Sequence, residues 1–406
     1  MDARETRGPG RSRVGTSWRL SHPGVPWLLR IVDAEREYSI ERYRPEWREQ
    51  VVALQTHLWD SDPGVSSDHF AWKYEQNLFD SEPLVYLALH DGEVAGARGF
   101  WETRWSNGDG SSQLRAAGAG DLVVSPEHRR RGLFRRIMEV AERDLAARGF
   151  PCLLNMSASP ITYLGSLRQG WHRVGAYRTM RGESRLVALM RRGAHAARSM
   201  PVVWRWASAA GPKDADGAFS RFDAAGALDS PDLVPSRDAR PAEMATLSNR
   251  IRRDTRMRHA VSREFYEWRF RSALSQYRFV FHYGSDADLD GYIALQARRR
   301  ADSRSLAIVD WTALDDSVRE RLLRAAITQA RPQSISVWTE SHSETTRALL
   351  SKAGFRRFDE TRGVDGFTPS LLVKPLAVDG GDADIDTEVW LQSANWDLQM
   401  LDSDNF

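Results

Sequence analysis

Cysteine, lysine and long apolar runs are scarce in this chain of 406 residues. The single cysteine, Cys152, excludes an intramolecular disulfide and a cysteine-based metal cluster, which favours a reducing compartment. No apolar run approaches the roughly 18 residues of a membrane-spanning helix, and the N-terminus lacks the apolar core of a signal peptide. We therefore expect a cytoplasmic protein without a membrane partner.

Positive charge is carried almost entirely by arginine, because the chain has only four lysines. The formal net charge of +2 does not suggest a general nucleic-acid binder, so no nucleic-acid partner is expected. Histidine, cysteine and acidic residues do not occur at metal-ligand spacing, and no metal site is predicted. The length suits two domains of ordinary size.

The stretch from Ala116 to Gly149 carries the most information. Its short apolar run, Leu122 to Val124, predicts a buried strand that stops at Ser125-Pro126. An amphipathic helix is predicted to follow, because apolar residues recur on one face while arginine and glutamate fill the other. The apolar face consists of Phe134, Ile137, Met138, Ala141 and Leu145.

Between this strand and helix lies a basic turn that ends in Arg129-Arg130-Arg131-Gly132. A helix N-terminus leaves amide N–H groups without intrahelical partners and carries partial positive charge, so it favours an anion. Gly132 permits the close approach of a ligand, and the three arginines add counter-charge. The turn is neither a Walker loop nor a GxGxxG fingerprint, but it predicts a phosphate site.

These residues resemble the pyrophosphate loop of the GNAT superfamily of N-acetyltransferases. The family pattern, Q/R-x-x-G-x-G/A after a strand ending in V-x-P, is matched by Val124–Pro126 and Arg129–Phe134, with Phe134 in place of the last small residue. The resemblance implies acetyl-CoA as co-substrate, with its pantetheine arm lying along the strand. The implied coenzyme-binding residues are Leu122, Val123, Val124, Arg129, Arg130, Arg131, Gly132, Leu133 and Phe134.

The resemblance also implies a reaction, in which an amine attacks the thioester directly and a backbone N–H stabilises the oxyanion. Asp121, from its place at the strand, is the candidate base, and the alternative is an edge carboxylate satisfied by neighbouring N–H groups. Asn155 matches an asparagine that hydrogen-bonds near the thioester in the family, or else it pairs with its own loop. Tyr163 is the candidate acid, one helical turn before Ser166, where the family often carries a tyrosine; otherwise water protonates the thiolate.

The order of elements around this stretch predicts a mixed sheet with helices on both faces, as in the GNAT family. An Asp91-Gly92 turn between two apolar runs predicts a β-hairpin. The full expectation is a strand near residues 38–40, a helix over Pro45–Leu58, hairpin strands Leu84–Leu89 and Val94–Phe100, the central strand and helix, a strand Leu153–Met156, a helix from Ser159-Pro160, and a last strand over about Val174–Met180.

The second half of the chain repeats the first. Trp268 follows Pro241 by the same 27 residues that separate Trp72 from Pro45. Where the first copy has its arginines, the second has acidic residues, including Asp315 and Asp316, which stabilise a helix start but repel a pyrophosphate. We therefore expect the second copy not to bind coenzyme A, and either to complete a substrate cleft or to pack against the first.

The predicted fold class is α/β (α+β), with two tandem GNAT-like domains, each a mixed twisted sheet flanked by helices. The tryptophans of the C-terminal segment, Trp390 and Trp396, predict that this segment docks on a domain surface. The expected organisation is a disordered basic tail (1–35), a GNAT-like catalytic domain with the acyl-CoA loop (36–185), a helix and linker (186–232), a degenerate GNAT-like domain (233–376) and the docking segment (377–406).

The function expected from the resemblance is acetyl transfer from acetyl-CoA to a primary amine of a small molecule or amino sugar. Two alternatives keep the fold. One is an aminoacyl transferase that uses charged tRNA, and the other is a non-catalytic acyl-CoA-binding or regulatory module. No motif names the amine or the oligomeric state.

Overall fold

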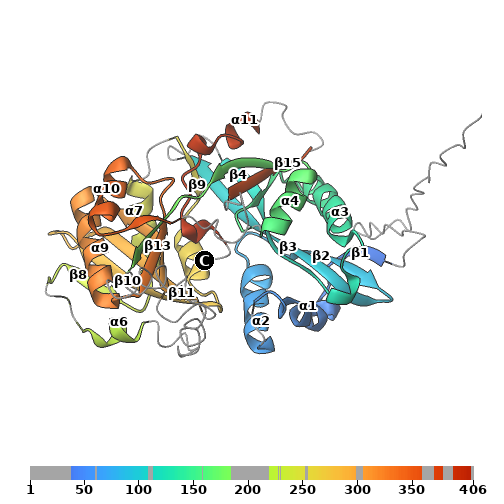
Figure 1. The fold of residues 1–406 in the computed structure, drawn as a ribbon, viewed down its shortest axis with the longest axis horizontal. Helices are drawn as coiled ribbons and strands as arrows, with labels where there is room; N and C mark the ends of the chain where they lie inside the picture. The colour runs from blue at the N-terminus through green and yellow to red at the C-terminus, as the bar shows by residue number, and fades with distance from the viewer. Residues whose placement is uncertain are drawn as a thin grey trace, which may run out of the picture.

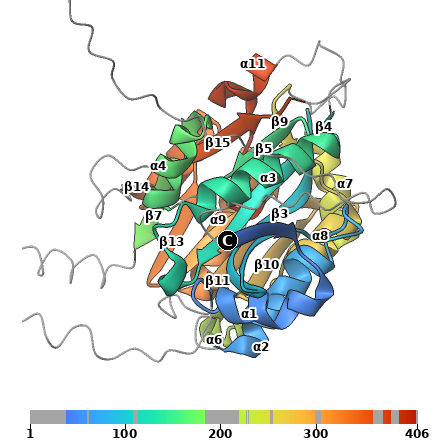
Figure 2. The same cartoon turned by 90° about the vertical axis from the view of Figure 1, so that its right-hand side faces the viewer.

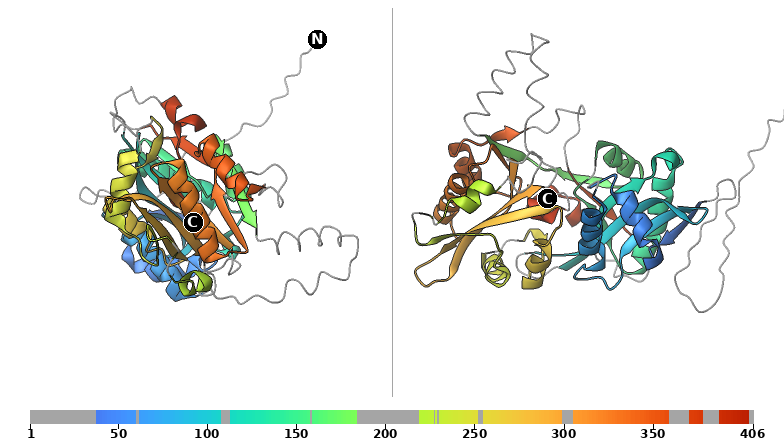
Figure 3. Two further views of the ribbon diagram at one scale, coloured as in Figure 1. Left: turned by 90° about the vertical axis from the view of Figure 1, so that its left-hand side faces the viewer. Right: turned by 90° about the horizontal axis from the view of Figure 1, so that it is seen from below.

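The computed structural model describes residues 38–59, 62–107, 113–157, 159–183, 219–226, 228, 230–251, 255–298, 305–358, 370–377 and 387–403. The predicted tail 1–35 and most of the predicted helix and linker lie outside these residues. Within them, two mixed sheets flanked by helices lie side by side (Figures 1 and 3), so the predicted fold class is confirmed. No helix in the described part of the chain combines the length and the apolar character needed to cross a membrane.

The first sheet has the strand order β1-β2-β3-β4-β5-β15-β6, with β9 paired to β3. Its strands are β1 (Tyr38–Arg42), β2 (Leu84–His90), β3 (Glu93–Asn107), β4 (Gln113–Val124), β5 (Cys152–Asn155), β6 (His172–Ala176), β9 (Met257–His259) and β15 (Ser370–Pro375). The predicted hairpin is confirmed as β2 and β3. Its turn needs positive φ at both central residues, and Asp91 (50°) and Gly92 (85°) supply it.

Helices cover both faces of this sheet (Figure 2). One face carries η1 (Pro45–Trp47), α1 (Arg48–Gln55), α2 (Pro63–Phe70) and the π-helix η2 (Ala71–Glu75), and the other carries α3 (Leu133–Ala147) and α4 (Pro160–Arg168). The alternation of β2 explains both cores, since Val85 and Leu87 pack against α1 whereas Tyr86 and Ala88 pack against α3. The amphipathic helix predicted after the basic turn is confirmed as α3.

The second sheet has the order β14-β7-β13-β12-β11-β10-β8. Its strands are β7 (Thr179–Glu183), β8 (Leu233–Ser236), β10 (Ser275–Tyr283), β11 (Leu289–Arg298), β12 (Ser305–Ala313), β13 (Ser334–Trp338) and β14 (Arg356–Phe358). The helices of this half are α6 (Ser220–Ala224), α7 (Pro241–Ile251), α8 (Arg263–Arg269), α9 (Asp316–Ala330) and α10 (Glu344–Lys352). A long helix therefore again follows a central strand.

The two halves exchange a strand. β7 comes from the first half but lies between β13 and β14 of the second sheet, and β15 comes from the second half but lies between β5 and β6 of the first (Figures 1 and 2). The prediction of one strand over Val174–Met180 is therefore wrong, because β6 ends at Ala176 and β7 begins at Thr179 in the other sheet. Neither sheet is therefore formed by one of the predicted contiguous ranges, 36–185 or 233–376, alone.

The repeated tryptophans meet where the halves touch. The rings of Trp72 and Trp268 stack with centroids 5.0 Å apart. Each indole N–H donates to the backbone carbonyl of the other residue, at 2.7 Å and 2.8 Å. A reciprocal contact of this kind is what a two-fold relation between the halves produces.

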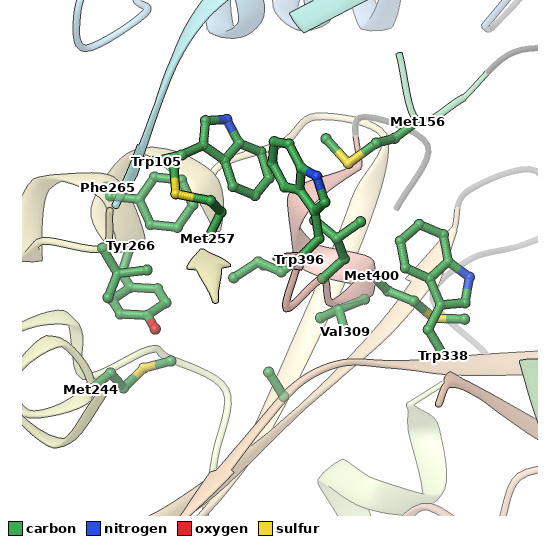
Figure 4. Packing of buried hydrophobic residues seen from close by; sticks show 14 of the residues in the cluster. Trp105, Met156, Met244, Met257, Phe265, Tyr266, Val309, Trp338, Trp396 and Met400 are labelled. Carbon is green, nitrogen blue, oxygen red and sulfur yellow. The ribbon is translucent and has the colours of Figure 1, made fainter. Parts of the chain in front are cut away.

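The C-terminal segment packs between the two halves. It contains α11 (Thr387–Trp390), η7 (Ser393–Asn395) and η8 (Met400–Asp402). Trp390 and Trp396 are buried, and the ring of Trp396 meets that of Trp105 edge-on at 5.1 Å (Figure 4). The segment thus joins one continuous apolar core formed by both halves.

Candidate active site

The loop between β4 and α3 has the conformation that the basic turn predicted. After a short 3-10 turn, η3 (Pro126–His128), the chain reaches Gly132, which is the N-cap of α3 at φ 72°. A side chain at this φ would be strained, and no atom lies within 4 Å of the position a Cβ would take. Gly132 has no side chain with which to cap the helix start, so no N-cap side chain occupies the first amide N–H groups.

The three arginines of the loop are exposed around this helix start. Arg129 donates through Nε to the carbonyl of Val124 at 3.1 Å, and Arg131 donates to the carbonyl of Glu127 at 3.3 Å. Both bonds fold the side chains back along the loop. The loop itself is tied to β1, because the Tyr38 hydroxyl lies 2.7 Å from Nδ1 of His128.

Beside this loop the two central strands separate. β4 and β5 pair in parallel from Ala116↔Cys152 to Gly118↔Leu154, and no pair follows although β4 continues to Val124. The predicted coenzyme-binding residues Leu122, Val123 and Val124 lie on this free stretch of β4. A ligand backbone can therefore pair with the edge that β5 leaves open.

A cavity of about 240 Å³ lies at the separation. Its wall combines the turn after α1, β3, β4, the end of β5 with the loop that follows it, and the start of α4. It consists of Leu58, Trp59, Arg98, Gly120, Asp121, Leu122, Asn155, Ser157, Ser159 and Thr162. The cavity thus receives residues from both faces of the sheet. The basic loop lies at the end of the same strand, β4.

Asp121 is buried beneath this cavity in an ion pair. Its carboxylate lies 2.9 Å from Nζ of Lys73 and accepts a 2.9 Å hydrogen bond from the amide of Gln55. Burial alone would raise the pKa of Asp121, but the charge of Lys73, with His69 at 3.9 Å, outweighs it and holds the pKa below its ordinary value. A carboxylate so stabilised is a weak proton acceptor, and the predicted role of general base does not fit it.

Asn155 lies in the cavity wall, as predicted, but its side-chain oxygen accepts the backbone N–H of Ser157 at 3.0 Å. The alternative of an amide that pairs with its own loop is therefore the observed arrangement. Tyr163 does not belong to the wall; it packs against the core beneath α3. The neighbouring Thr162 and Ser159 face the cavity instead, so the predicted acid at Tyr163 does not fit the geometry.

Phe134 turns away from the loop mouth. Its ring contacts α4, where a Cβ built on Gly165 would lie 3.0 Å from it. The bulky residue therefore fills the space between α3 and α4 and leaves the helix start at Gly132 open. Leu133, the first residue of α3, is buried in the core and can offer a ligand only its backbone.

The corresponding helix start in the second half is closed. Asp315 is the N-cap of α9, and its carboxylate accepts the N–H groups of Ser317 and Val318 at 2.8 Å and 2.9 Å. Its own carboxylate therefore takes the place that a phosphate would need.

The second sheet also has a strand separation, and the C-terminal segment fills it. β12 and β13 pair only as far as Ala307↔Ser336. Beyond that point the N–H of Trp311 donates to the side-chain oxygen of Gln399 at 3.1 Å, and η8 lies against β12. In the second sheet, a side chain of the C-terminal segment therefore bonds to β12 where β13 has left it. In the first sheet, the corresponding edge of β4 stays open.

Several residues at the site were not predicted from the sequence, among them Trp59, Lys73 and Arg98. Lys73 belongs to an aromatic-rich segment that is typical of a packed core, and its partner Asp121 lies 48 residues away. Its residue type could have drawn attention to it, because Lys73 is one of only four lysines in an arginine-rich chain. Among the described residues, no group of histidine, cysteine and acidic side chains could hold a metal ion.

Comparison with known proteins agrees with this geometry. The family model described as acetyltransferase (GNAT) family matches residues 51–159, from α1 to the N-cap of α4. A GCN5-related N-acetyltransferase from Anabaena variabilis is similar in structure, with a TM-score of 0.55, 13% identity and coverage of 84% of this chain and 73% of that one.

A GCN5-related N-acetyltransferase from Kribbella flavida gives a TM-score of 0.50 at 11% identity, covering 83% of this chain and 72% of that one. At these identities the likeness shows the fold alone. No curated protein matches the chain. The matched residues contain the start of α3, the strand separation and most of the cavity wall, so the match to the acetyltransferase (GNAT) family falls on the part of the chain that forms the candidate site.

Proposed function

We propose that the protein transfers the acetyl group of acetyl-CoA to a primary amine of a small molecule. The observation that carries the proposal is the uncapped start of α3 at Gly132, placed at the end of the strand that separates from β5. The amide N–H groups and the guanidinium groups of Arg129 and Arg131 suit the pyrophosphate. The free edge of β4 suits the pantetheine arm.

In this proposal the thioester reaches the cavity of about 240 Å³ beside Gly120 and Asn155. The amine nitrogen attacks the thioester carbon, the tetrahedral oxyanion collapses, and the carbon–sulfur bond breaks to release the thiol of coenzyme A. Asp121 is the single carboxylate in the described wall, and it is engaged by Lys73. We therefore assign the transfer of the amine proton to water, for which the cavity has room.

The proposal of a small-molecule acceptor is based on the chemistry of the cavity wall. The wall joins the apolar Leu58 and Trp59 to the hydroxyl groups of Ser157, Ser159 and Thr162. Such a wall suits an aliphatic amine that carries polar groups, as amino sugars do. The second half contributes a closed helix start, which supports a single coenzyme site in each chain.

The first test is thermal protection by acetyl-CoA. The wild-type protein should unfold at a higher temperature with millimolar acetyl-CoA, and the double variant Arg129→Glu/Arg131→Glu should lose this protection. The matched control is Arg143→Glu/Arg168→Glu, which makes the same charge change at exposed positions toward the C-terminal ends of α3 and α4 and should keep the protection. Absence of protection in the wild type would argue against the coenzyme site.

The second test is turnover, measured as thiol release from acetyl-CoA with glucosamine, kanamycin, spermidine and lysine as acceptors. Amine-dependent release supports the transferase. Binding of acetyl-CoA without release on any amine would instead favour a non-catalytic module, and salt-dependent binding of tRNA would favour an aminoacyl transferase.

A further inference from the structure

The inference concerns a β-bulge in β4, at the wall of the cavity. In the register of β3 and β4, Arg98 lies opposite Leu122 and Phe100 lies opposite Ala119, so Gly120 and Asp121 together face one residue of β3. A bulge takes peptide groups out of the ladder and re-aims them. These peptide groups lie beyond Gly118, the last residue of β4 that pairs with β5.

Arg98 holds this bulge from one side. Its guanidinium is buried, with 2% of the residue exposed, and donates through Nη1 to the carbonyl of Gly120. It shares a face of β3 with Phe100 and lies 5.5 Å from the centre of that ring. Arg98 also forms part of the cavity wall, so its charge lies beside the reacting groups.

Lys73 holds the bulge from the other side. Its ammonium pairs with the carboxylate of Asp121, and a Cβ built on Gly120 would lie 2.6 Å from Nζ of Lys73 and 2.9 Å from the Trp101 ring. Residue 120 therefore has no room for a side chain. The two cations fix consecutive residues of one strand from opposite faces of the sheet.

The hydrogen bond from Arg98 acts on a single peptide unit. The carbonyl of Gly120 and the N–H of Asp121 belong to the same planar trans group, so fixing one fixes the other in the opposite direction. A charged donor on the carbonyl also polarises the unit and strengthens its N–H as a donor. Backbone N–H groups placed in advance are what a developing oxyanion needs.

We propose that Arg98 is a positioning residue for acyl transfer, which orients and polarises the peptide unit between Gly120 and Asp121 at the thioester. This inference rests on the proposed function. Arg98 forms no bond to the coenzyme in this scheme, because the coenzyme's phosphates lie at the α3 start. Its effect should therefore fall on turnover and not on the binding of acetyl-CoA.

The test compares Arg98→Met, Arg98→Lys and Arg98→Ala with the wild type, using acetyl-CoA and the amine that gives the fastest thiol release. Arg98→Met should lower kcat on the order of 100-fold, with the Kd for acetyl-CoA unchanged. Arg98→Ala should regain turnover with guanidinium chloride but not with ethylammonium chloride, since only guanidinium restores the planar donor. The matched control is Arg104→Met, an arginine of the same strand whose side chain is 55% exposed.

Folding is checked by the unfolding midpoint, and Arg98→Lys, which retains a cation, replaces Arg98→Met if the latter does not fold. Wild-type kcat in Arg98→Met, or no rescue by guanidinium, would overturn the inference while leaving the proposed function intact. An equal loss of acetyl-CoA binding and turnover would also overturn it. A wild-type protein that releases no thiol on any amine would overturn the proposed function and this inference with it.

Discussion

Single residues decide which half can accept a pyrophosphate. Gly132 leaves the start of α3 uncapped, whereas Asp315 fills the start of α9 with its own carboxylate. The same contrast holds at the separated strands, where the N–H of Trp311 is already bonded to Gln399. The start of α9 is thus capped by a side chain of its own loop, whereas Gly132 has no side chain with which to cap α3.

Asp80 predicts a pH dependence of stability. Burial and the nearby Glu102 raise the pKa of Asp80 to about 6, from an ordinary value of 3.8. The folded state therefore favours the neutral acid, and this stabilisation is present below about pH 4 and lost as the pH rises through about 6. Asp80→Asn should stabilise the protein at neutral pH by about 1 kcal/mol, a figure reduced for the partial exposure of the group.

Urea unfolding at about pH 4.5 and about pH 7.5 measures this effect. Asparagine keeps an oxygen for the N–H of Glu102, which Asp80 accepts at 3.1 Å, so that hydrogen bond is not lost. Equal stability changes at both pH values would contradict the assigned cause.

The buried pair of Lys73 and Asp121 predicts strong energetic coupling. Asp121→Asn removes the carboxylate 2.9 Å from a buried ammonium and should cost about 3 kcal/mol of unfolding free energy. Lys73→Met should be costly for the same reason. The double variant should cost clearly less than the sum of the two, and strict additivity in this double-mutant cycle would show that the pair does not interact.

At the scale of elements, the exchanged strands make each sheet depend on both halves. β15 provides the partner of both β5 and β6, with pairs from Leu372↔Asn155 and from Ser370↔Ala176. A fragment of residues 36–185 lacks this strand and should not form a monomer that binds acetyl-CoA. Co-expression with residues 219–406 should restore binding, and an active fragment on its own would contradict the strand exchange.

Local elements could be predicted from the sequence, because their signals lie within a few residues. The hairpin turn at Asp91-Gly92, the apolar face of α3 and the helix after Ser159-Pro160 all appear where expected. The strand exchange could not be predicted, since β6 and β7 are separated by only two residues and look like one strand. A strand's partner depends on contacts far away in the chain, which periodicity does not encode.

The candidate site also has one part that the sequence could predict and one part that it could not. The basic turn at Arg129–Gly132 is a local pattern, and the structure places its Gly132 at the start of α3, as the pattern predicted. The surroundings of Asp121 are not local, because Gln55 and Lys73 come from 66 and 48 residues away. The role predicted for Asp121 therefore took no account of the partners that hold its carboxylate.

At the scale of the whole molecule, the described part of the chain contains two mixed sheets, each with a strand separation, and the start of α3 is not capped by a side chain of its N-cap residue as the start of α9 is. The reciprocal contact of Trp72 and Trp268 relates the halves, and the C-terminal segment closes the second separation while it fills the space between them. The second half thus completes the first sheet through β15.

The most direct measurement of this account is the stoichiometry of acetyl-CoA binding by isothermal titration calorimetry. The account predicts one acetyl-CoA per wild-type chain, no binding to Arg129→Glu/Arg131→Glu, and one per chain for the control variant Arg143→Glu/Arg168→Glu. Two sites per chain, or binding that survives the double substitution in the loop, would contradict it.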